Sequence, residues 1–209
     1  MGKKIIGLTG TYCAGKNYVA GLLEKRGLPV LDVDKLGHEA IAGKKEAITA
    51  RFGADVLGPG GEVDRRRLGA KVFGKPGEMA DLEAIVHPEA NRLTLRWLEA
   101  QGDRPCVINA ALLHRSSAFE LLDAVILVRA PLPIRLLRAK KRDKLPWPAI
   151  IRRFKSQRGF FSRYRNKSPG KIADIHVIDN WGCPVFASRP LTNALERRIE
   201  EILAIEGIL

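Results

Sequence analysis

A glycine-rich turn close to the N-terminus constrains the fold of this chain more than any other feature. An apolar run at residues 5–9 leads into it, and apolar residues at helical spacing follow until Gly27. The turn consists of Gly10, Thr11, Tyr12, Cys13, Ala14, Gly15, Lys16 and Asn17. Glycines let successive backbone N–H groups point at a phosphate, and the start of a helix adds partial positive charge. The pattern G-x-x-x-x-G-K between a strand and a helix therefore predicts a phosphate-binding loop.

Two residues of this loop decide its chemistry. Lys16 is expected to reach the terminal phosphates of a bound nucleotide. Asn17 stands where the pattern has a Ser or Thr hydroxyl that holds Mg²⁺, and its side-chain carbonyl oxygen can bind a hard cation as a neutral ligand. We therefore take Asn17 as the candidate metal ligand. The alternative is a plain strand-to-helix turn in which Lys16 is merely solvated.

Short apolar runs alternate with stretches of helical spacing along the chain. The runs lie at residues 5–9, 29–32, 106–109, 124–128 and 175–178. Parallel neighbours in a sheet need long crossovers, so this alternation predicts an α/β fold with a five-stranded parallel sheet and flanking helices. Residues 35–101 look mainly helical and form an insertion between the second and third strands.

A pair of acids closes the second run. Asp32 and Asp34 are expected to end an extended segment, where residues two apart share one face, at the edge of the sheet that binds ligands in α/β folds. A carboxylate there can accept the proton of an attacking hydroxyl, and Asp32 is the candidate base. The alternative is structural: Asp34 caps a helix that begins near Lys35, and Asp32 accepts N–H groups of the loop.

Positive charge is concentrated in one segment. The chain has 36 Lys and Arg against 23 Asp and Glu, a net charge of +13. Residues 129–171 hold 15 of these cations and one acid, Asp143, so this segment carries +14 and the rest of the chain is nearly neutral. Arg135, Arg138 and Arg142 share one face of a predicted helix. This distribution indicates a localised polyanion site rather than a diffuse affinity for nucleic acid or membrane.

Composition narrows the class of protein. A chain of 209 residues with 45% hydrophobic and 28% charged residues is long enough for one globular domain over residues 1–209. The three cysteines are far apart, which argues against a disulfide framework or a zinc site. No long apolar stretch and no signal-peptide pattern is present. We therefore expect a cytoplasmic protein that does not bind membranes, and a monomer.

The ordered motifs together resemble the dephospho-coenzyme A kinase family of P-loop kinases. The similarity covers most of the chain and includes the loop at residues 10–17 and the strand end at residues 30–34. The further matching segments are Arg51-Phe52-Gly53-Ala54-Asp55-Val56-Leu57, Val63-Asp64-Arg65, His87-Pro88, Ala173-Asp174 and Val177-Ile178-Asp179-Asn180.

This resemblance implies ATP-dependent phosphorylation of the 3′-hydroxyl of dephospho-coenzyme A, with Mg²⁺ as cofactor and ATP and dephospho-coenzyme A as ligands. It implies that residues 35–101 bind the acceptor substrate and that residues 135–171 form a basic lid. The implied catalytic residues are Lys16, Asp32, Arg138 and Arg142. The implied ATP contacts are residues 10–18, ending at Tyr18, and Asn180; the implied substrate contacts are Asp34 and His87.

The chain departs from the family pattern at positions close to the chemistry. Cys13 and Ala14 replace a glycine and a serine of the loop, and Asn109 and Arg115 replace two acids after the third strand. Two alternatives therefore remain open. The chain could be a degenerate P-loop protein that binds nucleotide or RNA without chemistry, since aromatics interleave with the cations of the basic segment. It could also be a kinase for another nucleoside-like acceptor.

Overall fold

The computed structural model describes residues 3–157, 159–160, 162–165, 174–182 and 189–209. The chain divides into two compact units. The first comprises Met1–Leu31 and Gln101–Leu209, and the second comprises Asp32–Ala100. No helix in the described residues is long and apolar enough to cross a membrane.

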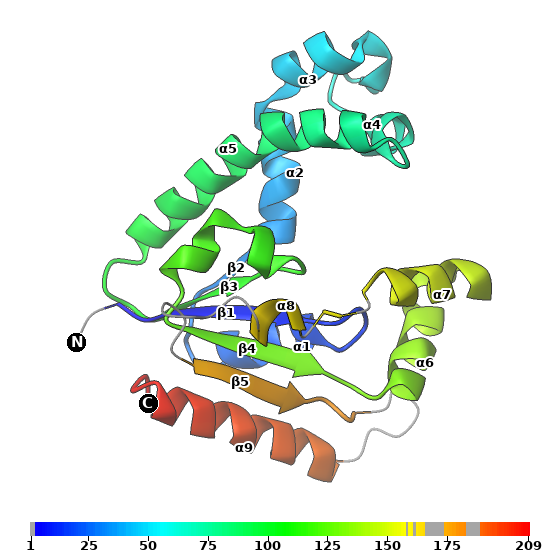
Figure 1. Ribbon diagram of the computed structural model, residues 1–209. Coiled ribbons are helices and arrows are strands. Elements are labelled where there is room, and N and C mark those ends of the chain that lie inside the picture. The colour runs from blue at the N-terminus through cyan, green and yellow to red at the C-terminus, as the bar shows by residue number, and fades with distance from the viewer. Residues whose placement is uncertain (1–2, 158, 161, 166–173, 183–188) are drawn as a thin grey trace. The chain divides into compact units, whose positions relative to one another are not determined.

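Five strands form one parallel sheet, which confirms the fold class predicted from the sequence (Figure 1). The strands are β1 (Ile5–Gly10), β2 (Val30–Asp32), β3 (Cys106–Asn109), β4 (Ala124–Arg129) and β5 (Asp174–Asp179). Their order in the sheet is β2-β3-β1-β4-β5. β1 pairs in parallel with both β3 and β4, and β4 pairs in parallel with β5. The central strand β1 therefore delivers the glycine-rich loop to the middle of the carboxyl edge, where such sheets bind ligands.

Two helices cover one face of the sheet. Ile6 and Leu8 of β1 point to this face and are fully buried, as strands enclosed on both sides require. They pack against α1 (Lys16–Glu24) and α9 (Arg189–Ile205) within one core cluster. In Figure 1, α9 runs beside β5. On the opposite face, Gly7 lies against Leu113 and Leu122, from the connection between β3 and β4.

That connection and the segment after β4 complete the first unit. The connection holds two short 3₁₀ helices, η2 (Leu113–Arg115) and η3 (Ser117–Leu121). After β4 come α6 (Leu132–Asp143), α7 (Trp147–Ser156) and the short α8 (Ser162–Arg165). In Figure 1, α7 follows α6, against which it packs. These helices carry most of the described cations of the basic segment; Arg129 lies in β4, and Lys144 follows α6.

The second unit is helical. It contains α2 (Val33–Gly43), α3 (Lys45–Phe52), the 3₁₀ helix η1 (Ala54–Val56), α4 (Arg65–Val72) and α5 (Pro76–Ala100). Its own core consists of Ile48, Phe52, Val56, Leu68 and Val72. Between α3 and η1 the chain reverses at Gly53, whose φ of 91° favours glycine.

One local prediction was wrong at the start of this unit. Asp34 does not end an extended strand beside Asp32, because β2 ends at Asp32 and Asp34 lies in the first turn of α2. The cause is a helix cap: Asp32 Oδ1 accepts the backbone N–H groups of Asp34 and Lys35 at 3.1 and 3.4 Å. The cap is thus Asp32, not Asp34 as the structural alternative had it.

Candidate functional site

The glycine-rich loop has the backbone that phosphate binding requires. At Gly10 a Cβ atom would lie 2.6 Å from the carbonyl oxygen of Val128, so only glycine fits. Gly15 has a φ of 95° and Cys13 a φ of 60°, which turn the chain sharply into α1. The start of α1 has no side-chain cap and no acid in its first turn. Its positive end is therefore left for an anion.

Arg138 and Asn180 hold the loop from its carbonyl side. The Arg138 guanidinium donates to the carbonyl oxygens of Cys13 and Ala14 at 3.2 and 2.8 Å. Asn180 Nδ2 donates to the same Ala14 oxygen at 2.9 Å, and Asn180 Oδ1 accepts from Arg138 at 3.1 Å. Because these hydrogen bonds hold the carbonyl groups of Cys13 and Ala14, they fix the backbone of the glycine-rich loop in its observed conformation.

Tyr12 joins the loop to α6 and α7. Its N–H group donates to Gln157 Oε1 at 2.5 Å, and its carbonyl oxygen accepts from Arg135 Nε at 2.8 Å. The ring packs edge-on against Phe154, with 5.2 Å between the centroids. Its hydroxyl donates to Asp143 at the end of α6. Burial, together with Asp143, raises the pKa of the Tyr12 phenol.

Asp143 is shared by two arginines beside Tyr12. Its carboxylate oxygens lie 2.6 Å from Arg142 Nε and 2.9 Å from Arg153 Nη1. The hydrogen bond from Arg142, with help from Tyr12, lowers the pKa of Asp143 to about 2. Both guanidiniums also lie over the Tyr12 ring, at 5.2 and 5.7 Å from its centroid. Two cations sharing one anion leave a net positive charge next to the loop.

Oxygen atoms suited to a hard cation lie at the other side of the loop. Asn109, at the end of β3, donates from Nδ2 to Asn17 Oδ1 across 3.5 Å. Asn109 Oδ1 and Thr11 Oγ1 are buried and have no hydrogen-bond partner within the described residues. Neutral oxygen donors fit Mg²⁺ when phosphates supply the negative charge. No cluster of three His, Cys, Asp or Glu side chains occurs in the described part of the chain. The sequence identified Asn109 only as a departure from the family pattern.

The predicted site residues fall into the two units. Lys16 and Asn17 begin α1, Tyr18 follows them half-exposed, and Arg138, Arg142 and Asn180 surround the loop as described. Asp32, Asp34 and His87 belong to the second unit. Beyond the cap at the start of α2, Asp32 Oδ2 accepts no hydrogen bond from the described residues. His87 is exposed on α5, directly before Pro88.

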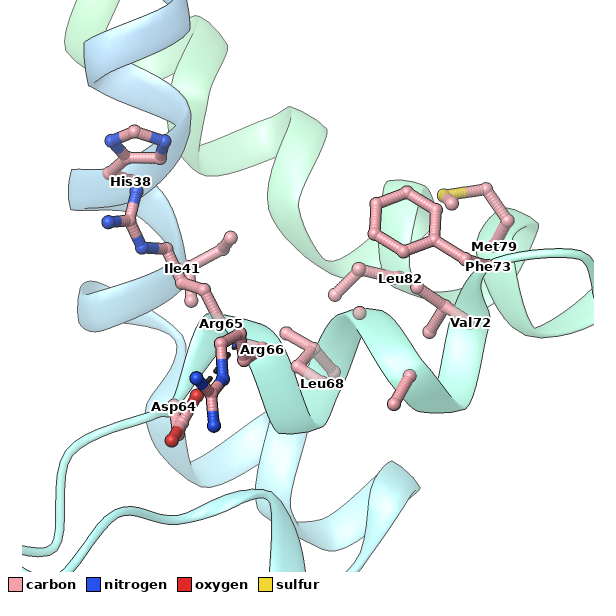
Figure 2. Close-up of a pocket in the computed structure, with 12 residues that line it drawn as sticks. His38, Ile41, Asp64, Arg65, Arg66, Leu68, Val72, Phe73, Met79 and Leu82 are labelled. Carbon is pink, nitrogen blue, oxygen red and sulfur yellow. Dashed lines mark hydrogen bonds between the residues drawn. The ribbon is translucent and has the colours of Figure 1, made fainter. Parts of the chain in front are cut away.

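A pocket of about 850 Å³ lies within the second unit, between α2, α4 and α5 (Figure 2). Its two ends differ in polarity. Figure 2 shows one end formed by His38, Asp64, Arg65 and Arg66, and the other by Val72, Phe73, Met79 and Leu82. Sequence reasoning missed this pocket. The signal was the run of three arginines after Asp64, followed by apolar residues at helical spacing.

The strand–loop–helix unit at the centre of a parallel sheet is typical of the P-loop kinase fold. Shikimate kinase from Bacteroides thetaiotaomicron shares this fold, with a TM-score of 0.50 and 13% identity over 96% of this chain and 98% of that chain. Residues 4–180 match the family described as Dephospho-CoA kinase. The chain therefore belongs to the dephospho-CoA kinase family.

Two further similarities agree with this family. The Dephospho-CoA kinase of Anaeromyxobacter dehalogenans is 43% identical over 149 residues, which cover 68% of this chain and 70% of the relative. The crystal structure of TT1252 from Thermus thermophilus is 32% identical, with a TM-score of 0.74 over 98% of both chains. The family resemblance drawn from the ordered motifs is thus confirmed.

Proposed function

We propose that this chain transfers the γ-phosphoryl group of ATP to the 3′-hydroxyl of dephospho-coenzyme A, giving coenzyme A and ADP. One observation carries the proposal: the open, uncapped start of α1 with Lys16, in a chain that matches the dephospho-CoA kinase family over residues 4–180. Phosphoryl transfer depends mainly on positioning and charge stabilisation, and a rigid loop with engaged carbonyl groups meets the first need.

In the proposed mechanism the first unit holds the donor nucleotide. The N–H groups of the loop and Lys16 bind the phosphates, and Arg142 stabilises charge that spreads over the transferred group. Arg138 and Asn180 act through the loop, whose carbonyl groups they bind. Asn17, with Asn109 behind it, would hold Mg²⁺. When bound, this ion neutralises phosphate charge and orients the phosphates for transfer.

The second unit supplies the groups for the acceptor. We propose that the Oδ2 atom of Asp32 accepts the proton of the 3′-hydroxyl as its oxygen attacks the γ-phosphorus, while Oδ1 holds the start of α2. Asp34 and His87 stay predicted contacts of the acceptor. The helical residues 35–101 stay the predicted substrate-binding region.

The contacts made by the basic segment favour a lid rather than an RNA-binding surface. Four of its cations, Arg135, Arg138, Arg142 and Arg153, contact the loop or Asp143. Arg158, Lys167 and Lys171 lie outside the described residues. The competing proposal, binding of single-stranded RNA, predicts tight binding of a short oligonucleotide that weakens steeply with salt. An ATP affinity that does not change when the oligonucleotide is added would contradict the competing proposal of RNA binding.

The direct test is a product assay. The pure chain is incubated with ATP, Mg²⁺ and dephospho-coenzyme A, and the acceptor is analysed by mass spectrometry. The proposal predicts the addition of one phosphoryl group at the 3′ position. Folded protein that forms no product during long incubation would overturn it, and a panel of nucleosides and nucleotides tests for another acceptor. Light scattering measures the oligomeric state, which we expect to be a monomer. Localisation of a tagged chain tests the expected cytoplasmic compartment.

A further inference from the structure

We infer that Tyr12 and Asp143 are positioning residues for phosphoryl transfer. They hold two guanidinium groups, those of Arg142 and Arg153, beside the phosphate loop, where these would bind oxygens of the transferred γ-phosphoryl group. The side chains of Tyr12 and Asp143 would act through the two arginines rather than on the nucleotide. This inference rests on the proposed function, because it assigns the residues that place positive charge for the transfer.

The Tyr12 ring is a fixed support for these guanidiniums. The backbone of Tyr12 bonds Gln157 and Arg135, one through its N–H group and the other through its carbonyl oxygen. Phe154 packs against the ring edge-on. The Arg135 guanidinium also lies over Phe154, 4.7 Å from the ring centroid, so the neighbouring ring is held as well. A ring anchored in this way has little conformational freedom left to lose when it holds a cation.

Asp143 supplies the negative charge that the two arginines share. It is the one acid in residues 129–171, and its side chain is only 13% exposed. Its Oδ2 atom alone accepts from the Tyr12 hydroxyl, from Arg153 Nη1 at 2.9 Å and from Arg142 Nη2 at 3.3 Å. Because three donors converge on one oxygen, the hydroxyl of the loop residue helps to set the place where both guanidiniums bind.

Both guanidiniums keep N–H groups for a ligand. Arg142 binds Asp143 through Nε and Nη2, and Arg153 binds it through Nη1. The remaining nitrogens, Arg142 Nη1 and Arg153 Nε and Nη2, have no partner within the described residues. The two side chains are 60% and 52% exposed. A guanidinium with free N–H groups in a fixed orientation suits phosphate oxygens, which can accept two parallel hydrogen bonds.

The positive charge of Arg142 acts on the middle of the loop. Burial raises the pKa of the Cys13 thiol, and the largest opposing influence is the charge of Arg142. Cys13 is itself a loop residue with a left-handed φ of 60°, and Arg138 binds its carbonyl oxygen. The Arg142 guanidinium therefore lies close enough to the loop to stabilise an anion that is bound there.

The first experiment measures steady-state kinetics of Tyr12→Phe, which removes the hydroxyl and keeps the ring. With dephospho-coenzyme A, kcat should fall about tenfold and KM for ATP should change by less than about threefold, because Arg142 acts on charge that develops during transfer. Asp143→Asn keeps an acceptor for the hydroxyl but removes the shared charge, and should lower kcat at least as much. A rise of kcat in Asp143→Asn would mean that Asp143 withholds the arginines from the phosphate, and would overturn the inference.

The second experiment is a double-mutant cycle that separates positioning from a structural role. If Tyr12 acts through the arginines, Tyr12→Phe should lower kcat by less than about twofold in a chain that carries Arg142→Gln and Arg153→Gln. The matched background carries Lys141→Gln and Lys155→Gln, two exposed cations of α6 and α7 with no bond to these groups. There Tyr12→Phe should keep its effect of about tenfold. Equal losses in the two backgrounds would show a purely structural role and would overturn the inference.

The third experiment does not depend on turnover. Calorimetry measures the binding of ADP with Mg²⁺ and aluminium fluoride, a mimic of the transferred phosphoryl group. Tyr12→Phe should weaken this complex about tenfold and should change the binding of ADP with Mg²⁺ alone by less than about twofold, because the arginines act on the transferred group. If the variant weakens the binding of ADP as much as that of the mimic, the hydroxyl shapes the loop itself and the inference is wrong.

The outcomes separate the inference from the proposed function. Phosphorylation of dephospho-coenzyme A, with equal losses in both backgrounds and unchanged binding of the mimic, would overturn the positioning role and leave the function intact. A chain that phosphorylates no acceptor, but whose Tyr12→Phe variant binds the mimic about tenfold more weakly, would support the positioning role and overturn the function.

Discussion

Arginines are used in opposite ways by the phosphate loop and by the pocket of the helical unit. Around the loop, Arg135 and Arg138 donate to backbone carbonyl oxygens, and Arg142 and Arg153 share Asp143. In the pocket, Arg65 and Arg66 reach no acid or carbonyl oxygen within the described residues. The first set forms bonds within the protein, although Arg142 and Arg153 together leave one net positive charge beside the loop, whereas the second set forms none with the described residues.

This difference separates the changes that should affect stability from those that should affect function. A group that bonds other parts of the protein leaves them unpaired when it is removed, so its loss destabilises the fold. A group without partners costs little stability when it is removed, so its loss appears in ligand binding or turnover. Asp32 combines both cases, because one oxygen caps α2 and the other is uncommitted.

Asp32→Asn should have the largest effect and isolates the uncommitted oxygen. Asparagine caps helices as well as aspartate does, so the start of α2 and the melting temperature should be preserved. Since an amide cannot accept the proton, kcat should fall by about 10²–10⁴-fold with ATP binding unchanged. Steady-state kinetics and calorimetry with ATP measure the two effects. Near-normal turnover would remove Asp32 from the role of base.

Arg138→Gln should destabilise the protein most. The change removes donors to the carbonyl oxygens of Cys13, Ala14 and Asn180, so we expect a loss of about 2–3 kcal/mol in the free energy of unfolding. Arg66→Gln, the matched change of an uncommitted arginine, should stay within about 0.5 kcal/mol of the parent chain. Urea denaturation measures both. Equal losses in the two variants would contradict the division between committed and uncommitted arginines.

The two regions also differ in how well sequence predicts them. All five strands were predicted within two residues of their observed ends. The three central strands, β3, β1 and β4, are buried and give mainly apolar runs, whereas the edge strands β2 and β5 are only partly buried. The loop was predicted because its glycines stand at fixed spacing. By contrast, the links from Tyr12 to Asp143 and Gln157 join residues more than 130 positions apart, and no local pattern encodes them. The pocket depends on the packing of three helices and left only the arginine run as a signal.

Asp143→Asn should lower stability in a pH-dependent way. Because Arg142 lowers the pKa of Asp143 from 3.8 to about 2, its charge stabilises the folded state above pH 4. This contribution is lost as the pH falls through the folded-state pKa, so the parent and the variant should differ by about 1–2 kcal/mol at pH 7 and converge near pH 2. Unfolding in urea at several pH values measures the difference. A gap that stays constant down to pH 2 would contradict the ion-pair origin of the effect.

Asn109→Asp should have the smallest effect and sharpens the picture of the metal side of the loop. Asn109 is 2% exposed and its Oδ1 atom has no partner in the described residues. A carboxylate here adds a negative charge next to Asn17 and replaces the N–H group that donates to Asn17 Oδ1 with an oxygen. With ATP bound, it should tighten Mg²⁺ binding about three- to tenfold, because the anion attracts the ion. Titrating Mg²⁺ into the ATP complex and following the melting temperature measures this change in affinity, and Asn91→Asp on α5 serves as the control. If Mg²⁺ affinity does not change, Asn109 does not face the ion, and its unpartnered Oδ1 atom has no role in metal binding.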